Sequence, residues 1–291
     1  MKNPLIIVAG LTALAGAAWF GATAYANNLA RQQIDQELLD ARDLADIQYD
    51  DVQVDLLTRS VSLKHVSIAP ANGGEPVLIE ELILDEFDQS SDIPSFLSAK
   101  ILGAQVNAAS LGELGDRIRE LGYPETLSLN SDISYRYDDL GRELDINNLS
   151  LSADDAGTLN ARLKLGNIQL GTDEMAFFRL IFGYPNLLVH GAELTFTDRS
   201  LVERIMQQRG KAEGLTGDQA TNKTLAALDV EIANTKDPLG KEILSQFRRF
   251  IASPDTFSVT VQPEQPLKIR DIPRSADPVD IARMLNLQVK G

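Results

Sequence analysis

The clearest pattern in the chain is an alternation of apolar and polar residues between Thr126 and Gly171. A period of two is typical of strands with one buried and one solvated side. Turn sequences at Asp138–Gly141 and Asp154–Gly157 divide the pattern into three strands. It therefore predicts an antiparallel meander with one apolar and one polar face. The apolar positions are Leu127, Leu129, Ile133, Tyr135, Tyr137, Leu144, Ile146, Leu159, Ala161, Leu163 and Leu165.

Shorter alternating segments precede the meander. Val52–Leu56 and Val61–Leu63 alternate regularly, but the register shifts at His65. Val66 and Ile68 then continue the apolar side, which predicts a bulge at the histidine. Further strands are predicted at Val77–Leu84, Ile101–Ala109, Leu187–Phe196, Phe257–Val261 and Pro266–Ile269.

Helical periodicity is concentrated after residue 172. One helix is predicted earlier, because Ser110 and Glu113 have the spacing of a capping box. Asp237-Pro238 and Asp277-Pro278 place an N-cap before a proline in the first helical turn, which is typical of helix starts. The later helices are predicted at Met175–Phe182, Ser200–Lys211, Asn222–Ala233 and Pro238–Ala252, with a final one from Asp277.

These elements predict an α+β fold in which helices cover one face of an antiparallel sheet. Met175–Phe182 and Pro238–Ala252 are the expected cover, because their apolar sides need burial and the meander is near in sequence. The predicted organisation is residues 1–30 as a membrane anchor or signal segment, 31–46 as an acidic juxtamembrane helix, and 47–291 as an extracytoplasmic region. That region divides into a β-rich part, 47–171, and a helix-rich part, 172–291.

The N-terminus determines the expected compartment. No charged side chain occurs from Asn3 to Ala30, and as a helix these residues would span about 42 Å, more than the roughly 30 Å of a bilayer core. Lys2 favours an orientation with the N-terminus inside. Two interpretations remain open: a retained single-pass anchor, or a signal peptide cleaved after Ala24-Tyr25-Ala26. Both place the remainder outside the cytoplasm, in the periplasm of a bacterium.

Composition excludes several classes of protein. The 291 residues contain 27 basic and 42 acidic side chains, for a net charge of −15, and no cysteine. The acidic balance argues against nucleic acid as a partner. The lack of cysteine excludes thiol catalysis, iron–sulfur clusters and a disulfide scaffold.

Candidate chemistry is sparse. The two histidines, His65 and His190, are each isolated in a strand-like segment, and no zinc-protease, nucleophile-elbow or phosphate-loop motif occurs. Paired acids such as Asp138-Asp139 and Asp154-Asp155 stand at turns, which explains them without a metal. We therefore assign no catalytic, cofactor-binding or metal-binding residues and expect no cofactor. Distant residues could still assemble a hydrolase site around either histidine.

The segment Tyr49–Asp55 followed by Val61–Ile68, together with the uncharged N-terminus and one-sided meander, is similar to AsmA-like bacterial inner-membrane proteins with β-rich periplasmic portions. The resemblance implies a single membrane span and a role in the cell envelope. Residues 200–252, predicted to be helical, depart from a simple elongated β-groove. The resemblance assigns no functional residues.

Three functions remain open on sequence grounds. The first is a non-enzymatic, membrane-anchored periplasmic protein for envelope scaffolding, assembly or partner binding. The second is a lipid-handling protein, if the apolar sheet face is left open. The third is a hydrolase with a dispersed active site. Expected partners are the membrane and either envelope proteins or lipid.

Overall fold

The computed structural model describes residues 35, 45–55, 60–70, 75–88, 94–168, 185–273 and 277–291. It has an α+β fold, in which antiparallel strands are accompanied by helices. The predicted N-terminal segment 1–30, most of the acidic helix 31–46 and the predicted helix Met175–Phe182 lie outside the described residues. In the part that is described, no helix is both long and apolar enough to cross a bilayer.

The chain divides into two compact units, Met1–Tyr135 and Arg136–Gly291. The boundary between the units lies within strand β6 (Thr126–Asp138). The sequence, in contrast, changes from mainly predicted strands to mainly predicted helices after residue 171. This difference arises because the meander strands that follow β6 cluster with the helix-rich part. The boundary between the two compact units therefore differs from the boundary between the β-rich and the helix-rich parts of the sequence.

The first unit is built mainly from strands. Their order in the sheet is β1-β3-β4-β5-β6, and β2 also pairs with β3. A 3-10 turn, η1, and a short helix, α3, follow β5. The bounds are β1 (Ala45–Gln48), β2 (Asp51–Asp55), β3 (Ser60–Pro70), β4 (Val77–Phe87), β5 (Phe96–Asn107), η1 (Ala108–Leu111) and α3 (Glu113–Glu120).

The predicted change of apolar side at His65 is confirmed, but the predicted bulge is wrong, because β3 pairs with β4 in one continuous register through this residue. His65 instead forms part of a row across three strands. His65 has a φ of 50°. The strand registers place it opposite Glu80, which in turn lies opposite Gly103 with a φ of 64°. In each of β3, β4 and β5 the buried positions change parity at this row. We call His65, Glu80 and Gly103 the inversion row.

Because the parity changes together in all three strands, their apolar residues remain on one side. Val61, Leu63, Val66 and Leu84 are fully buried there. Leu129 and Ile133 of β6 pack against this core, as the alternation predicts. Tyr135 donates a hydrogen bond from its hydroxyl to the Pro94 carbonyl oxygen at 3.3 Å, and burial raises its pKa to about 12, with a smaller contribution from Asp88.

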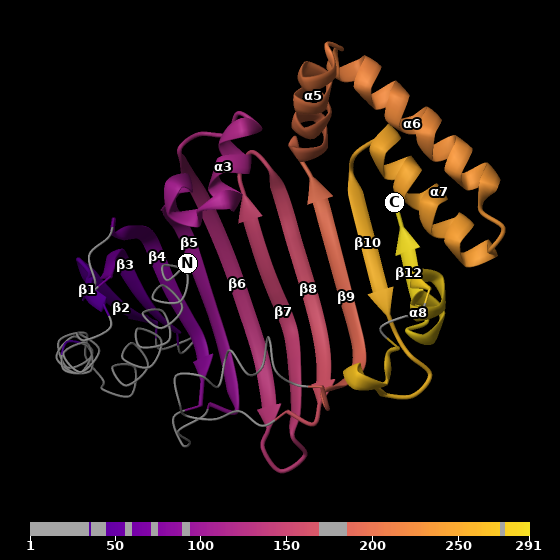
Figure 1. Ribbon diagram of the computed structural model, residues 1–291. Helices are drawn as coiled ribbons and strands as arrows, with labels where there is room; N and C mark the ends of the chain where they lie inside the picture. Colours follow the sequence, from indigo (N-terminus) through magenta and orange to yellow (C-terminus); the bar gives the residue numbers. More distant parts are fainter. Residues whose placement is uncertain are drawn as a thin grey trace. The chain divides into compact units, whose positions relative to one another are not determined.

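The second unit contains a sheet of order β7-β8-β9-β10-β12 (Figure 1). Strand β11 also pairs with β9. All of the described pairings are antiparallel. The strands are β7 (Glu143–Ala153), β8 (Gly157–Gly166), β9 (Leu188–Asp198), β10 (Thr256–Val261), β11 (Leu267–Lys268) and β12 (Leu287–Lys290). The predicted turn at Asp138 forms, with its carboxylate accepting a hydrogen bond from the Leu140 N–H at 3.1 Å.

Three longer helices connect β9 to β10 and stand at one end of these strands (Figure 1). Helix α7 begins at Pro238 and ends at Ala252, as predicted, because the Asp237 carboxylate accepts hydrogen bonds from the N–H groups of Leu239 and Gly240. These hydrogen bonds lower the pKa of Asp237. The other helices are α5 (Leu201–Glu213), α6 (Gly217–Asn234) and α8 (Pro278–Met284), with a 3-10 turn η2 (Ile269–Asp271).

Two local predictions are wrong. Ser110 does not cap a helix: its hydroxyl donates to the Asn107 carbonyl oxygen, and Asn107 caps the 3-10 turn that precedes α3. Helix α6 begins five residues before the predicted Asn222, because a complete capping box joins Thr216 to Gln219. In addition, β12 was not predicted from its four residues.

Candidate functional site

The second unit presents a continuous apolar side made by side chains from neighbouring strands. The registers place Leu151 opposite Leu159, and Leu159 opposite Phe196. Successive side chains on a strand point to opposite faces, so residues two apart share a face. The surface therefore extends from β7 to β9. We call the side that carries Leu149, Leu151, Leu159, Ala161 and Leu194 the leucine face.

The leucine face is unusual because its large side chains are accessible. The exposed fractions are 36% for Leu149, 46% for Leu151, 38% for Leu159 and 44% for Leu194. Ser150 and Ser152, on the other side of β7, are less exposed than the leucines beside them. Single exposed apolar residues are common on protein surfaces, but a contiguous group marks a binding surface.

Helix α7 covers one end of this side of the sheet. Phe250 and Ile251 pack in a cluster with Phe196 and Phe257, and the Phe250 and Phe257 ring centroids are 5.3 Å apart. One of the two predicted covering helices is thus present over β9 and β10, where the aromatic residues lie. The leucines of β7 and β8 are exposed, and the other predicted covering helix, Met175–Phe182, lies outside the described residues.

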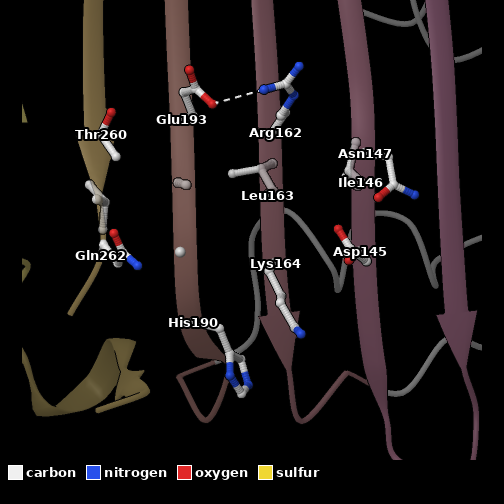
Figure 2. Close-up of a pocket in the computed structure, with 13 residues that line it drawn as sticks. Asp145, Ile146, Asn147, Arg162, Leu163, Lys164, His190, Glu193, Thr260 and Gln262 are labelled. Carbon is white, nitrogen blue, oxygen red and sulfur yellow. Dashed lines mark hydrogen bonds and ion pairs between the residues drawn. The ribbon is translucent and has the colours of Figure 1, made fainter. Parts of the chain in front are cut away.

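The opposite side of the same strands is polar and contains a shallow hollow of about 430 Å³ (Figure 2). Gly191, on β9, lies opposite Lys164, where the lack of a side chain leaves space. Arg162 and Glu193 are cross-strand partners and form an ion pair at 3.2 Å. Asp145 and Lys164 are cross-strand partners in the next polar row.

His190 lies in this hollow, at the end where Asp145 and Lys164 also lie (Figure 2). A Cβ on Gly166 would come within 2.5 Å of the His190 Nε2 atom, so the imidazole rests directly over this glycine. His190 itself is the extra residue at an irregularity between β8 and β9, where the register shifts between Lys164 and Leu165.

The structure does not bring the two histidines together, since they belong to different units. His65 Nδ1 lies 3.1 Å from an Asp50 carboxylate oxygen, and both side chains are more than 70% exposed. Within the described ranges no serine hydroxyl is hydrogen-bonded to either histidine, and no cluster of three potential metal ligands occurs. The dispersed hydrolase site is therefore left without a supporting contact among these residues.

The sequence pattern placed Leu159 and Ala161 on an apolar side, but it identified neither Leu149, Leu151 and Leu194 as part of that side nor the hollow. The signal for the hollow was present in Gly191, a glycine inside a strand, which often marks a close approach or an open site. Charged residues two apart, Arg162 and Lys164, were the second signal. Neither residue stands in a known motif, so only the strand pairing could have connected them to His190 and Asp145.

Comparison with known proteins finds relatives but assigns them no function. A family model described as "Uncharacterized protein" matches residues 150–291. A protein of Aquifex aeolicus (strain VF5), also described as "Uncharacterized protein", is 23% identical over 283 residues, which cover 94% of this chain and 92% of the relative. No solved structure matches the chain significantly. The residues matched by the family model lie in the second unit, which carries the leucine face and the hollow.

Proposed function

We propose that this protein is a non-enzymatic, membrane-anchored protein of the bacterial periplasm that handles lipid on its leucine face. The observation that carries the proposal is the exposure of Leu149, Leu151, Leu159 and Leu194 on one side of three paired strands. Burying such apolar surface contributes roughly 25 cal/mol per Å². An apolar ligand on this face would remove that area from water.

The composition of the face supports acyl chains as the ligand. Its central positions are occupied by leucine and alanine, whose side chains contain no hydrogen-bonding groups. Neighbouring strands are about 4.8 Å apart, so the surface from β7 to β9 is roughly 10 Å wide. Such a surface offers contact area but no polar specificity, which suits hydrocarbon chains of variable structure.

The uncharged segment from Asn3 to Ala30 supports the proposed location. A retained anchor would hold both units at the membrane surface, where lipid is available. A reporter that is active only outside the cytoplasm, fused after Gly291, should therefore be active. An inactive reporter on a stably expressed fusion would contradict the location, and a mature N-terminus at Asn27 would replace the anchor with a cleaved signal peptide.

A second candidate, envelope scaffolding through a partner protein, would use the same surface. Phe247 favours it: this residue is 40% exposed and forms an edge contact with Phe257, with ring centroids 6.0 Å apart. Aromatic residues are enriched in protein interfaces relative to the rest of the surface. We rank this candidate second because the exposed apolar area comes mainly from the leucines of the leucine face, and Phe247 adds only one aromatic side chain to it.

Photo-crosslinking separates the two candidates. A benzophenone amino acid is placed at Leu151 or Leu194 in the full chain, which is expressed in bacterial membranes and irradiated. The lipid-handling proposal predicts adducts with the mass of a lipid. A discrete adduct with the mass of a protein would support scaffolding instead.

The matched control is the same substitution at Ser150, which neighbours Leu151 but lies on the polar side. It should yield neither kind of adduct. Equal crosslinking at Ser150 and Leu151, or no adduct at either leucine, would contradict binding on the leucine face.

A further inference from the structure

Lys164 and Asp145 stand opposite one another on β8 and β7 but do not form an ion pair. The neighbouring polar pair, Arg162 with Glu193, does form one. Among the described residues, no carboxylate lies within ion-pair distance of the Lys164 ammonium. The hollow therefore holds one cation and one anion that are not neutralised by each other (Figure 2).

We propose that this hollow binds a compact zwitterion, which carries an oxyanion next to an ammonium group. Lys164 binds the oxyanion, and the His190 ring, held over Gly166, lies at the same end as a further polar contact. Asp145 binds the ammonium. Gly191 lies opposite Lys164 on the side away from Asp145, and the space over it accommodates the oxyanion, because no side chain fills it.

The position of the hollow makes this site independent of the leucine face. Arg162 and Lys164 flank Leu163 on β8, so they point to the opposite side of the sheet. The hydrogen bonds that a ligand would make with Lys164 and Asp145 are charge-assisted. Each contributes enough binding free energy to change the affinity by roughly tenfold. A zwitterion gains both contacts, whereas a simple anion or cation gains one and meets the other residue of like charge.

The experiment measures binding of O-phosphoethanolamine to the full chain in detergent by calorimetry, with inorganic phosphate and ethanolamine as comparisons. We expect saturable binding of the zwitterion, and binding weaker by about tenfold or more for each comparison ligand. Lys164→Met and Asp145→Asn should each weaken zwitterion binding about tenfold. Lys211→Met, which removes an exposed lysine from α5, should leave binding unchanged.

Vesicles distinguish a lipid headgroup from a free solute. If the source is a lipid, vesicles with phosphoethanolamine headgroups should compete with the free ligand, whereas phosphocholine vesicles should not, because their ammonium has no N–H for Asp145. Absence of competition by either vesicle assigns the site to a free zwitterion.

Gly191→Leu provides a test that leaves every charge in place. A Cβ at Gly191 would make an ordinary contact at 3.4 Å from the Val261 carbonyl oxygen, so the backbone tolerates the substitution, but the larger side chain fills the hollow. We expect loss of binding, with folding verified by circular dichroism. No saturable binding by the unmodified chain, equal binding of phosphate and phosphoethanolamine, or equal loss in Lys211→Met would overturn the proposal.

Discussion

The two units contain strands with the same alternation but differ in what happens to the apolar side. In the first unit, Leu63 and Leu84 are fully buried, whereas in the second unit Leu151 and Leu194 are 46% and 44% exposed. Both pairs of leucines occupy equivalent alternating positions on a strand. The comparison teaches that alternation determines which side of a sheet a residue occupies, but not whether anything covers that side.

The largest expected effect tests this difference directly. Leu63→Asp would place a charge in the buried core of the first unit and should cost at least about 4 kcal/mol. Leu151→Asp places the same charge on the accessible leucine face and should cost no more than about 0.5 kcal/mol. Urea unfolding monitored by hydrogen exchange of peptides from each unit would measure both effects. Equal losses would show that the leucine face is buried.

A smaller effect should come from the covered end of the second unit. Phe250→Ala removes the ring that contacts Phe196 and Phe257 and should cost about 3 kcal/mol. Hydrogen exchange should accelerate in α7 and β10 while peptides of β3 and β4 remain protected. Phe247→Ala serves as the control, because this ring is 40% exposed and should cost less. A greater loss for Phe247→Ala would indicate that α7 packs through a different side.

Gly103→Ala tests the inversion row in the first unit. The φ of 64° is unfavourable for a residue with a side chain, and the added Cβ would lie 2.5 Å from the Glu80 Cδ atom. We expect a loss of about 1–2 kcal/mol in thermal or urea unfolding.

Glu80→Ala in the same chain should recover only part of this loss, because it removes the collision but not the backbone strain. Complete recovery would show that the backbone at Gly103 is not strained.

The smallest effect concerns acid stability of the first unit. Hydrogen bonds from Lys64 and, secondarily, Ser62 lower the pKa of Glu81. Because the folded-state pKa lies below that of the unfolded chain, Glu81 stabilises the fold above the unfolded value, and this contribution is lost as the pH falls through the folded value. Glu81→Gln should therefore reduce the decline in unfolding midpoint between about pH 6 and pH 3.

The control is Glu264→Gln, which alters an exposed glutamate in the second unit. It should reproduce the acid profile of the unmodified chain. An unchanged profile in Glu81→Gln would show that the Lys64 and Ser62 contacts do not persist in solution.

Much of the fold was predictable because its signals are local. The start of α7 follows from Asp237-Pro238, and the change of apolar side at His65 is visible in the residues themselves. The bulge inferred from that change is wrong, because Glu80 and Gly103 change parity with His65 and no extra residue is needed. The start of α6 was missed because Thr216 is followed by Gly217, a poor helix former, although Gln219 completes the cap. The error at α6 concerns a boundary, where short-range signals compete.

The sites were less predictable because they depend on distant residues. Leu151 and Leu194 are 43 positions apart in sequence, and their exposure depends on where α7 packs. Asp145, Lys164 and His190 come together only through the pairing of three strands, with an irregularity that adds His190. No local pattern encodes either the exposure of these leucines or the fact that Asp145 and Lys164 do not form an ion pair with each other.

The inversion row also constrains how the sequence of the first unit can change in evolution. Deleting His65 alone would restore simple alternation within β3, but it would move Val66 and Ile68 to the opposite side of the sheet relative to β4. The loss could be accommodated only by matching deletions near Glu80 and Gly103. Three separate segments of the gene can therefore gain or lose a codon at this row only if all three change together.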